Sequence, residues 1–134
     1  MRMSSLLLCA TCLAPLTGQA TPPRPEVSCR IDASDAVTTV VPTASADPYH
    51  FDQVDLEADF RFAAQYLLPA AKLKTYVYQR AKNRLVLLHV AEYALESERC
   101  ENGSKPLGTH RVYSPHIEIE LLYQCTLRCR PAPP

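Results

Sequence analysis

Histidine and carboxylate side chains are the groups in this chain best suited to acid–base chemistry. His50 stands just before Asp52, and an imidazole beside a carboxylate can act as a general base. Their position at the entrance to a predicted strand instead favours a turn or capping role. His89 lies in an apolar stretch, where we expect a hydrogen-bonded core histidine rather than a ligand. His110 and His116 are the remaining scattered candidates.

Glu118 and Glu120 form a second candidate pair. On a strand they would share a face about 6.6 Å apart, a separation that overlaps the carboxylate pairs of glycoside hydrolases. Neighbours on one strand usually both point into solvent, and cross-strand pairing with Lys72 or Lys74 explains them equally well. The chain has no G-x-S-x-G or H-E-x-x-H motif and only 3 glycines. We therefore expect a protein that is not an enzyme and has no cofactor or metal.

Cysteine supplies the covalent chemistry. The chain holds 6 cysteines, and those downstream of the predicted leader are Cys29, Cys100, Cys125 and Cys129. An even number in a short exported domain predicts two disulfides. On a strand, Cys125 and Cys129 would lie about 13 Å apart, beyond the roughly 4.4–6.8 Å between bridged Cα atoms, so each should pair with Cys29 or Cys100. A tetrathiolate zinc site is the alternative, although no two of these four cysteines form a C-x-x-C pair.

A row of alternate residues gives the best candidate for binding. Strand geometry places four of them on one face: Lys74, Tyr76, Tyr78 and Arg80. Tyrosine and arginine are enriched at recognition surfaces because they combine a large apolar area with a polar tip. We predict that another protein binds this row. In the alternative, both tyrosines only cover the sheet and pair across strands with Tyr66 or Tyr93.

The first 20 residues read as a secretory signal peptide. Arg2 provides the basic start, residues 6–16 are mostly apolar, and cleavage is expected near Ala20. The apolar run is too short for a membrane span, which needs about 20 residues. This leader predicts a periplasmic or secreted protein, in which disulfides can form.

The remaining chain of about 114 residues has the length of one domain. Lysine plus arginine and aspartate plus glutamate number 14 each, so the chain has no excess of positive charge that would favour nucleic acid. A lipid anchor on Cys9 or Cys12 is a further alternative, although neither follows Gly, Ala or Ser. Asn102 begins an N-x-S pattern for glycosylation, which a turn explains at least as well.

Period-two alternation predicts a mainly β fold. We expect strands over residues 56–68, 73–79, 85–95 and 111–129, with a helix over 56–68 as the main alternative. The strand over 85–95 is uniformly apolar and should be buried on both faces, and residues 96–110 should form a long loop. The predicted architecture is a small antiparallel meander or sandwich stapled by two disulfides.

The expected domain organisation has four parts. Residues 1–20 are the signal peptide, and residues 21–49 form a proline-rich, irregular arm that carries Cys29. Residues 50–130 form the antiparallel β domain, and residues 131–134 form a proline-rich tail.

Three functions of different class remain open from the sequence. The first is an exported non-catalytic binding module, such as an inhibitor or an immunity-type protein that neutralises a toxin targeted to the envelope. The second is an envelope structural or secretion-assembly component. The third is a small secreted hydrolase, which we expect only if His50 with Asp52, or Glu118 with Glu120, lines a cleft.

Overall fold

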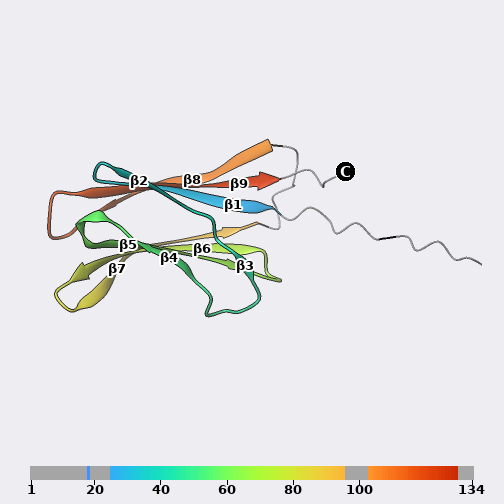
Figure 1. Cartoon of the computed structure of the whole chain (residues 1–134), viewed down its shortest axis with the longest axis horizontal. Helices are drawn as coiled ribbons and strands as arrows, with labels where there is room; N and C mark the ends of the chain where they lie inside the picture. The colour runs from blue at the N-terminus through green and yellow to red at the C-terminus, as the bar shows by residue number, and fades with distance from the viewer. Residues whose placement is uncertain (1–17, 19–24, 96–102, 130–134) are drawn as a thin grey trace, which may run out of the picture.

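Two β-sheets pack face to face in the computed structural model of this chain (Figure 1). The structure describes Gly18 and residues 25–95 and 103–129. The predicted leader (apart from Gly18), Cys100, Asn102 and the tail lie outside the described residues. Within the described ranges, no helix has the length and apolar character needed to cross a membrane.

The first sheet contains the two ends of the domain. Its order is β2 (Ala36–Val40), β1 (Glu26–Ala33), β9 (Glu120–Cys129) and β8 (Gly103–Tyr113). All its pairings are antiparallel. The chain therefore leaves this sheet after β2 and returns to it with β8, which makes the architecture a sandwich rather than a simple meander.

The second sheet is built from the middle of the chain. Its order is β3 (Ala44–Ser45), β5 (Phe60–Leu67), β6 (Lys72–Ala81) and β7 (Arg84–Ala94), and β4 (Asp52–Asp55) also pairs with β5. A short 3-10 turn, η1 (Glu57–Asp59), precedes β5. The short β3 runs parallel to β5, whereas the other pairings of this sheet are antiparallel.

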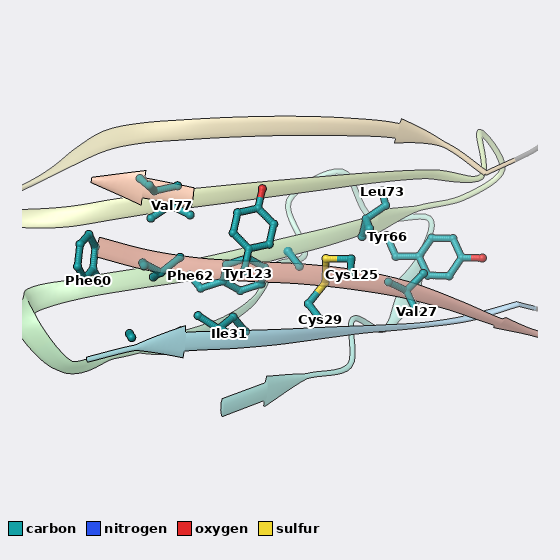
Figure 2. Close-up of a cluster of buried hydrophobic side chains, with 14 of the residues drawn as sticks. Val27, Cys29, Ile31, Phe60, Phe62, Tyr66, Leu73, Val77, Tyr123 and Cys125 are labelled. Atoms are coloured by element: carbon teal, nitrogen blue, oxygen red, sulfur yellow. A yellow bond between two sulfur atoms is a disulfide. The ribbon is translucent and has the colours of Figure 1, made fainter. Parts of the chain in front are cut away.

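The core fills the space between the inner faces of the two sheets (Figure 2). In β1, β6 and β9 every second residue is buried, as expected for strands with one covered face. The rings of Phe62 on β5 and Tyr123 on β9 meet edge to face at 5.1 Å between centroids and join the sheets. Edge-to-face packing of this kind adds about 0.5–1.5 kcal/mol to the effect of burial alone.

A disulfide joins β1 to β9 inside this core. Cys29 and Cys125 stand directly opposite one another in the register, and neither is exposed. This confirms the prediction that Cys125 does not pair with Cys129. Cys129 is itself disulfide-bonded, and Cys100 lies outside the described residues.

The structure corrects several predicted elements. The arm expected to be irregular, residues 21–49, contains β1, β2 and β3 in its described part, because β1 pairs with β2 and β9, and β3 pairs with β5. Residues 103–110, expected in a loop, belong to β8. The strand predicted over 111–129 is interrupted by a turn between Tyr113 and Glu120. Residues 60–67 form strand β5, so the helical alternative is wrong.

β7 also differs from its prediction, because it is an edge strand and not a doubly buried one. Its outer face is open to solvent: Leu87 is 48 % exposed and Val90 is 47 % exposed. An apolar run alone does not distinguish a central strand from an edge strand whose outer face is also apolar. The register with β6 shifts between Val77 and Tyr78, which changes which residues of β7 face outward.

Candidate functional site

The predicted binding row lies on the outer face of the second sheet. β6 buries Leu73, Thr75, Val77 and Gln79 and turns the alternate residues outward. Lys74, Tyr76, Tyr78 and Arg80 therefore share one face, as strand periodicity predicted. Arg80 is exposed and the other three residues are half-buried.

Aromatic and aliphatic side chains gather around this row. Tyr76 stacks on Tyr78, with 6.2 Å between ring centroids and 15° between the ring planes, and Phe51 meets the Tyr76 ring edge-on at 5.7 Å. On β7, Val90 pairs with Tyr76 and Leu87 pairs with Tyr78. We call these five residues the outer aromatic patch: Phe51, Tyr76, Tyr78, Leu87 and Val90. Such contiguous exposed apolar surface is typical of interaction sites.

The alternative in which these tyrosines pair with Tyr66 or Tyr93 is wrong. Tyr66 and Tyr93 both stand opposite Leu73, on the inner face of the sheet, and Tyr66 is part of the core. The register thus places them on the other side from Tyr76. Burial, followed by the neighbouring Tyr76, raises the pKa of Tyr78, so its phenol remains protonated and able to donate a hydrogen bond.

A loop before β4 holds Phe51 in this patch. The Gln65 side chain donates to the carbonyl oxygen of Pro48 at 2.5 Å, and the backbone N–H of His50 donates to Asp47. Gln65 is only 5 % exposed although it lies on the outer face of β5, because this loop covers it. Phe51 was not predicted as part of the binding surface, because it lies outside the regular strands and belongs to no periodic pattern.

Ion pairs flank the patch on both sides. Glu92 contacts Lys72 at 2.7 Å and Lys74 at 3.3 Å, and these lysines lower its pKa by hydrogen bonding. Arg61 binds Asp55 through two hydrogen bonds of 2.5 and 3.0 Å and lowers the pKa of Asp55. Lys74 therefore shares the Glu92 carboxylate with Lys72, whereas Arg80 makes no ion pair among the described residues.

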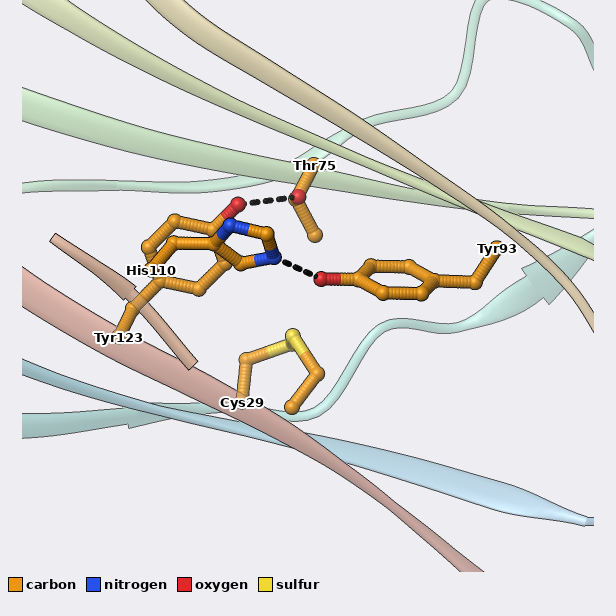
Figure 3. The surroundings of a disulfide bond; sticks show 6 residues. Cys29, Thr75, Tyr93, His110 and Tyr123 are labelled. Carbon is orange, nitrogen blue, oxygen red and sulfur yellow. Dashed lines mark hydrogen bonds between the residues drawn. A yellow bond between two sulfur atoms is a disulfide. The ribbon is translucent and has the colours of Figure 1, made fainter. Parts of the chain in front are cut away.

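Two histidines meet between the sheets rather than on the patch. The rings of His89 on β7 and His110 on β8 lie 4.8 Å apart between centroids. Figure 3 shows the His110 ring stacked on that of Tyr123. Tyr93 is hydrogen-bonded to Nε2 of His110, and the Tyr123 hydroxyl is hydrogen-bonded to Thr75 at 2.8 Å. Burial, followed by the nearby His89, lowers the pKa of His110.

His89 deviates from the hydrogen-bonded core histidine that its apolar context predicted. Its buried Nε2 has no hydrogen-bond partner among the described residues. Within those residues, no group of three or more His, Cys, Asp or Glu side chains is arranged to hold a metal ion. Among the described residues, the rings of His89 and His110 therefore pack against aromatic side chains beside the disulfide.

The remaining candidate residues have surface positions. His50 Nε2 lies 3.4 Å from Asp52 Oδ2, and the same oxygen accepts a 2.6 Å hydrogen bond from the backbone N–H of Thr43. Asp52 thereby fixes the Thr43 turn, in keeping with the capping role expected for this pair.

Glu118 and Glu120 do not share a strand face, because Glu118 lies in the turn before β9. Both are exposed and line a 370 Å³ pocket with Tyr113 and Ile117. Glu120 pairs with Arg111 at 3.3 Å and not with a lysine of β6. A glycosidase acid works in an apolar site that excludes water, whereas both of these carboxylates are open to solvent.

Comparison of the chain with known protein families, with curated proteins and with solved structures finds no match.

Proposed function

We propose that this chain is an exported, non-catalytic protein-binding module whose partner covers the outer aromatic patch. The observation that carries the proposal is the cluster of Phe51, Tyr76 and Tyr78 beside exposed Leu87 and Val90. Rigid aromatic side chains on a sheet provide large contact area at low cost in conformational entropy. An inhibitor or an immunity-type protein that neutralises an envelope-targeted toxin is the class that best fits a small, disulfide-bonded exported domain.

One prediction and one observation support export. A leader of the kind predicted for residues 1–20 would direct the chain out of the cytoplasm, and a disulfide such as Cys29–Cys125 persists most readily in an oxidising compartment. Together they favour the periplasm or the extracellular space.

Assembly into an envelope structure would use the open sheet edges. In the first sheet the β8 edge carries Lys105 and Pro106, and proline removes one of the donors that an added strand would need. This edge is blunted in the way natural proteins avoid edge pairing. Because the β8 edge is a poor site for strand addition, we favour the outer face of β6 as the docking surface.

The test is capture of a partner by the tagged mature protein from an envelope extract of the producing cell, with Tyr78→Ala beside the native chain. We expect Tyr78→Ala to retain the fold, because Tyr78 is not in the core, and to weaken binding by about 1–3 kcal/mol. Tyr113→Ala is the matched control, since Tyr113 is 64 % exposed on the other sheet.

Equal binding by the native chain and the patch variants would contradict the proposal. A partner that binds the native chain, Tyr76→Ala and Tyr78→Ala with equal affinity does not use the patch. A melting temperature that falls by several degrees in Tyr78→Ala would show that this residue supports the fold instead, and binding would then be measured with Tyr78→Phe and Leu87→Ala.

A further inference from the structure

A basic pocket lies at one end of the sandwich, beside the outer aromatic patch. The tip of the β6–β7 hairpin and the β8–β9 loop enclose a volume of 690 Å³, and both turns lie at the same end of the molecule (Figure 1). The hairpin contributes three cations to the lining: Arg80, Lys82 and Arg84. The loop contributes His116, and Val86 and Pro115 add apolar surface.

The pocket is held together by a tertiary contact. Ser114, which begins the β8–β9 loop, donates from its hydroxyl to the side-chain oxygen of Gln79 on β6 at 2.8 Å. The same hydroxyl oxygen accepts hydrogen bonds from the backbone N–H groups of His116 and Ile117, both at 3.2 Å. These bonds fix the loop against the hairpin, so the pocket is formed before any ligand arrives.

The positive charge of this pocket is not compensated. Among the described residues, none of its three cations lies within ion-pair distance of a carboxylate, in contrast to Arg61, Lys72, Lys74 and Arg111. The described residues that line the pocket include no aspartate or glutamate. Asp55, whose pKa Arg80 helps to lower from a distance, is already bound by Arg61. A concave surface of one charge sign concentrates ligands of the opposite sign.

Arg80 connects the pocket to the outer aromatic patch, because it lines the pocket and also follows Tyr78 on the outer face of β6. We infer that the pocket binds a carboxylate-rich segment of the protein partner whose apolar surface covers the patch, an inference that rests on the proposed function. Guanidinium groups bind carboxylates through paired, charge-assisted hydrogen bonds, and the apolar lining suits the aliphatic stem of glutamate. A volume of 690 Å³ lies in the range of pockets that hold a ligand.

The first experiment uses acetylated, amidated hexaglutamate as the probe and follows the backbone NMR signals of the full mature chain. We expect shifts at Lys82, Arg84 and His116 that weaken as sodium chloride rises from about 50 to about 300 mM, because salt screens the attraction. The double variant Lys82→Glu/Arg84→Glu should lose at least about tenfold in affinity. Arg30→Glu/Arg128→Glu, which makes the same charge change on exposed positions of the first sheet, should bind as the native chain does.

Three results of this experiment would overturn the inference. Absence of shifts at the pocket would do so, as would inorganic phosphate or free glutamate binding there as tightly as the peptide, which would indicate a small anion. Binding to phosphatidylglycerol vesicles that Lys82→Glu/Arg84→Glu abolishes, without peptide binding, would assign the pocket to a membrane surface.

Capture from the envelope extract separates this inference from the proposed function. If both hold, Tyr78→Ala and Lys82→Glu/Arg84→Glu each reduce recovery of the same partner. If only Tyr78→Ala reduces it, the pocket has no part in binding while the proposed function stands. If neither variant reduces it, the partner binds elsewhere and both proposals are wrong.

Discussion

Buried polar residues between the sheets make the interior sensitive to protonation. His110 faces His89, Tyr93 and Tyr123, and its pKa is lowered by burial and by His89. Burial also raises the pKa of both tyrosines, which keeps their hydroxyl groups protonated at neutral and acidic pH. Among the described residues no carboxylate forms an ion pair with His110, so its protonation would add a positive charge that none of them balances.

The stability of the native chain should consequently fall as the pH drops. Because the pKa of His110 is lower in the folded than in the unfolded state, the folded state binds fewer protons from about pH 6.5 downward, and stability is lost as pH falls through this window. The size of this loss is the difference in pH slope between the native chain and a variant without the imidazole. Urea unfolding of the native chain and His110→Gln at about pH 7.5, 6.5 and 5.5 measures it. Equal pH slopes in the two proteins would contradict this prediction.

Strand position determines how much each apolar residue contributes to stability. Val77 on β6 is fully buried in the core, whereas Val90 on β7 is 47 % exposed, although both are valines on adjoining strands. β6 is central, with β5 and β7 on its two sides, and β7 is an edge. The same side chain therefore has a packing role in one strand and is available for contact with a partner in the other.

Substituting these two valines separates the roles. Val77→Ala should lower the free energy of unfolding by about 1.5–3 kcal/mol, because it removes two buried methyl groups and leaves a cavity. Val90→Ala should change it by less than about 0.5 kcal/mol. Chemical denaturation monitored by circular dichroism gives both values, and similar losses in the two variants would show that β7 is covered in the isolated protein.

The first and last strands of the described domain, β1 and β9, pair with each other. β1 lies between β2 and β9, and the Cys29–Cys125 disulfide spans a sequence separation of 96 residues. In the chain-entropy description, a crosslink that closes a loop of this size stabilises the fold by about 4–5 kcal/mol, mainly by restricting the unfolded chain. For a domain of this size, that is a large share of the usual stability of about 5–15 kcal/mol.

Removal of this disulfide should lower stability strongly. We expect Cys29→Ala/Cys125→Ala to lose about 4 kcal/mol in urea unfolding under oxidising conditions. Because both cysteines are fully buried, mild reductant should cleave the bond in the native protein only as fast as the sandwich opens. A loss below about 1 kcal/mol would mean that residual structure in the unfolded chain already holds β1 near β9.

Local sequence determined which residues share a face. Alternation along β6 placed Lys74, Tyr76, Tyr78 and Arg80 together, and alternation along β9 excluded a bond between Cys125 and Cys129. Both results follow from the period of two in an extended chain, which needs no knowledge of neighbouring strands. The mainly β fold follows from the same pattern.

Tertiary structure alone decided which strands are neighbours and what covers each face. That β7 is an edge, that Phe51 contacts the Tyr76 ring, and that Glu92 pairs with Lys74 all depend on contacts between separate segments. β2 was not predicted because its short sequence is weakly apolar and is stabilised by pairing with β1. The basic pocket depends on the hydrogen bond between Ser114 in the β8–β9 loop and Gln79 on β6, which are far apart in the sequence. Contacts of this kind arise from the packing of the whole chain, and the local periodicity of the sequence does not predict them.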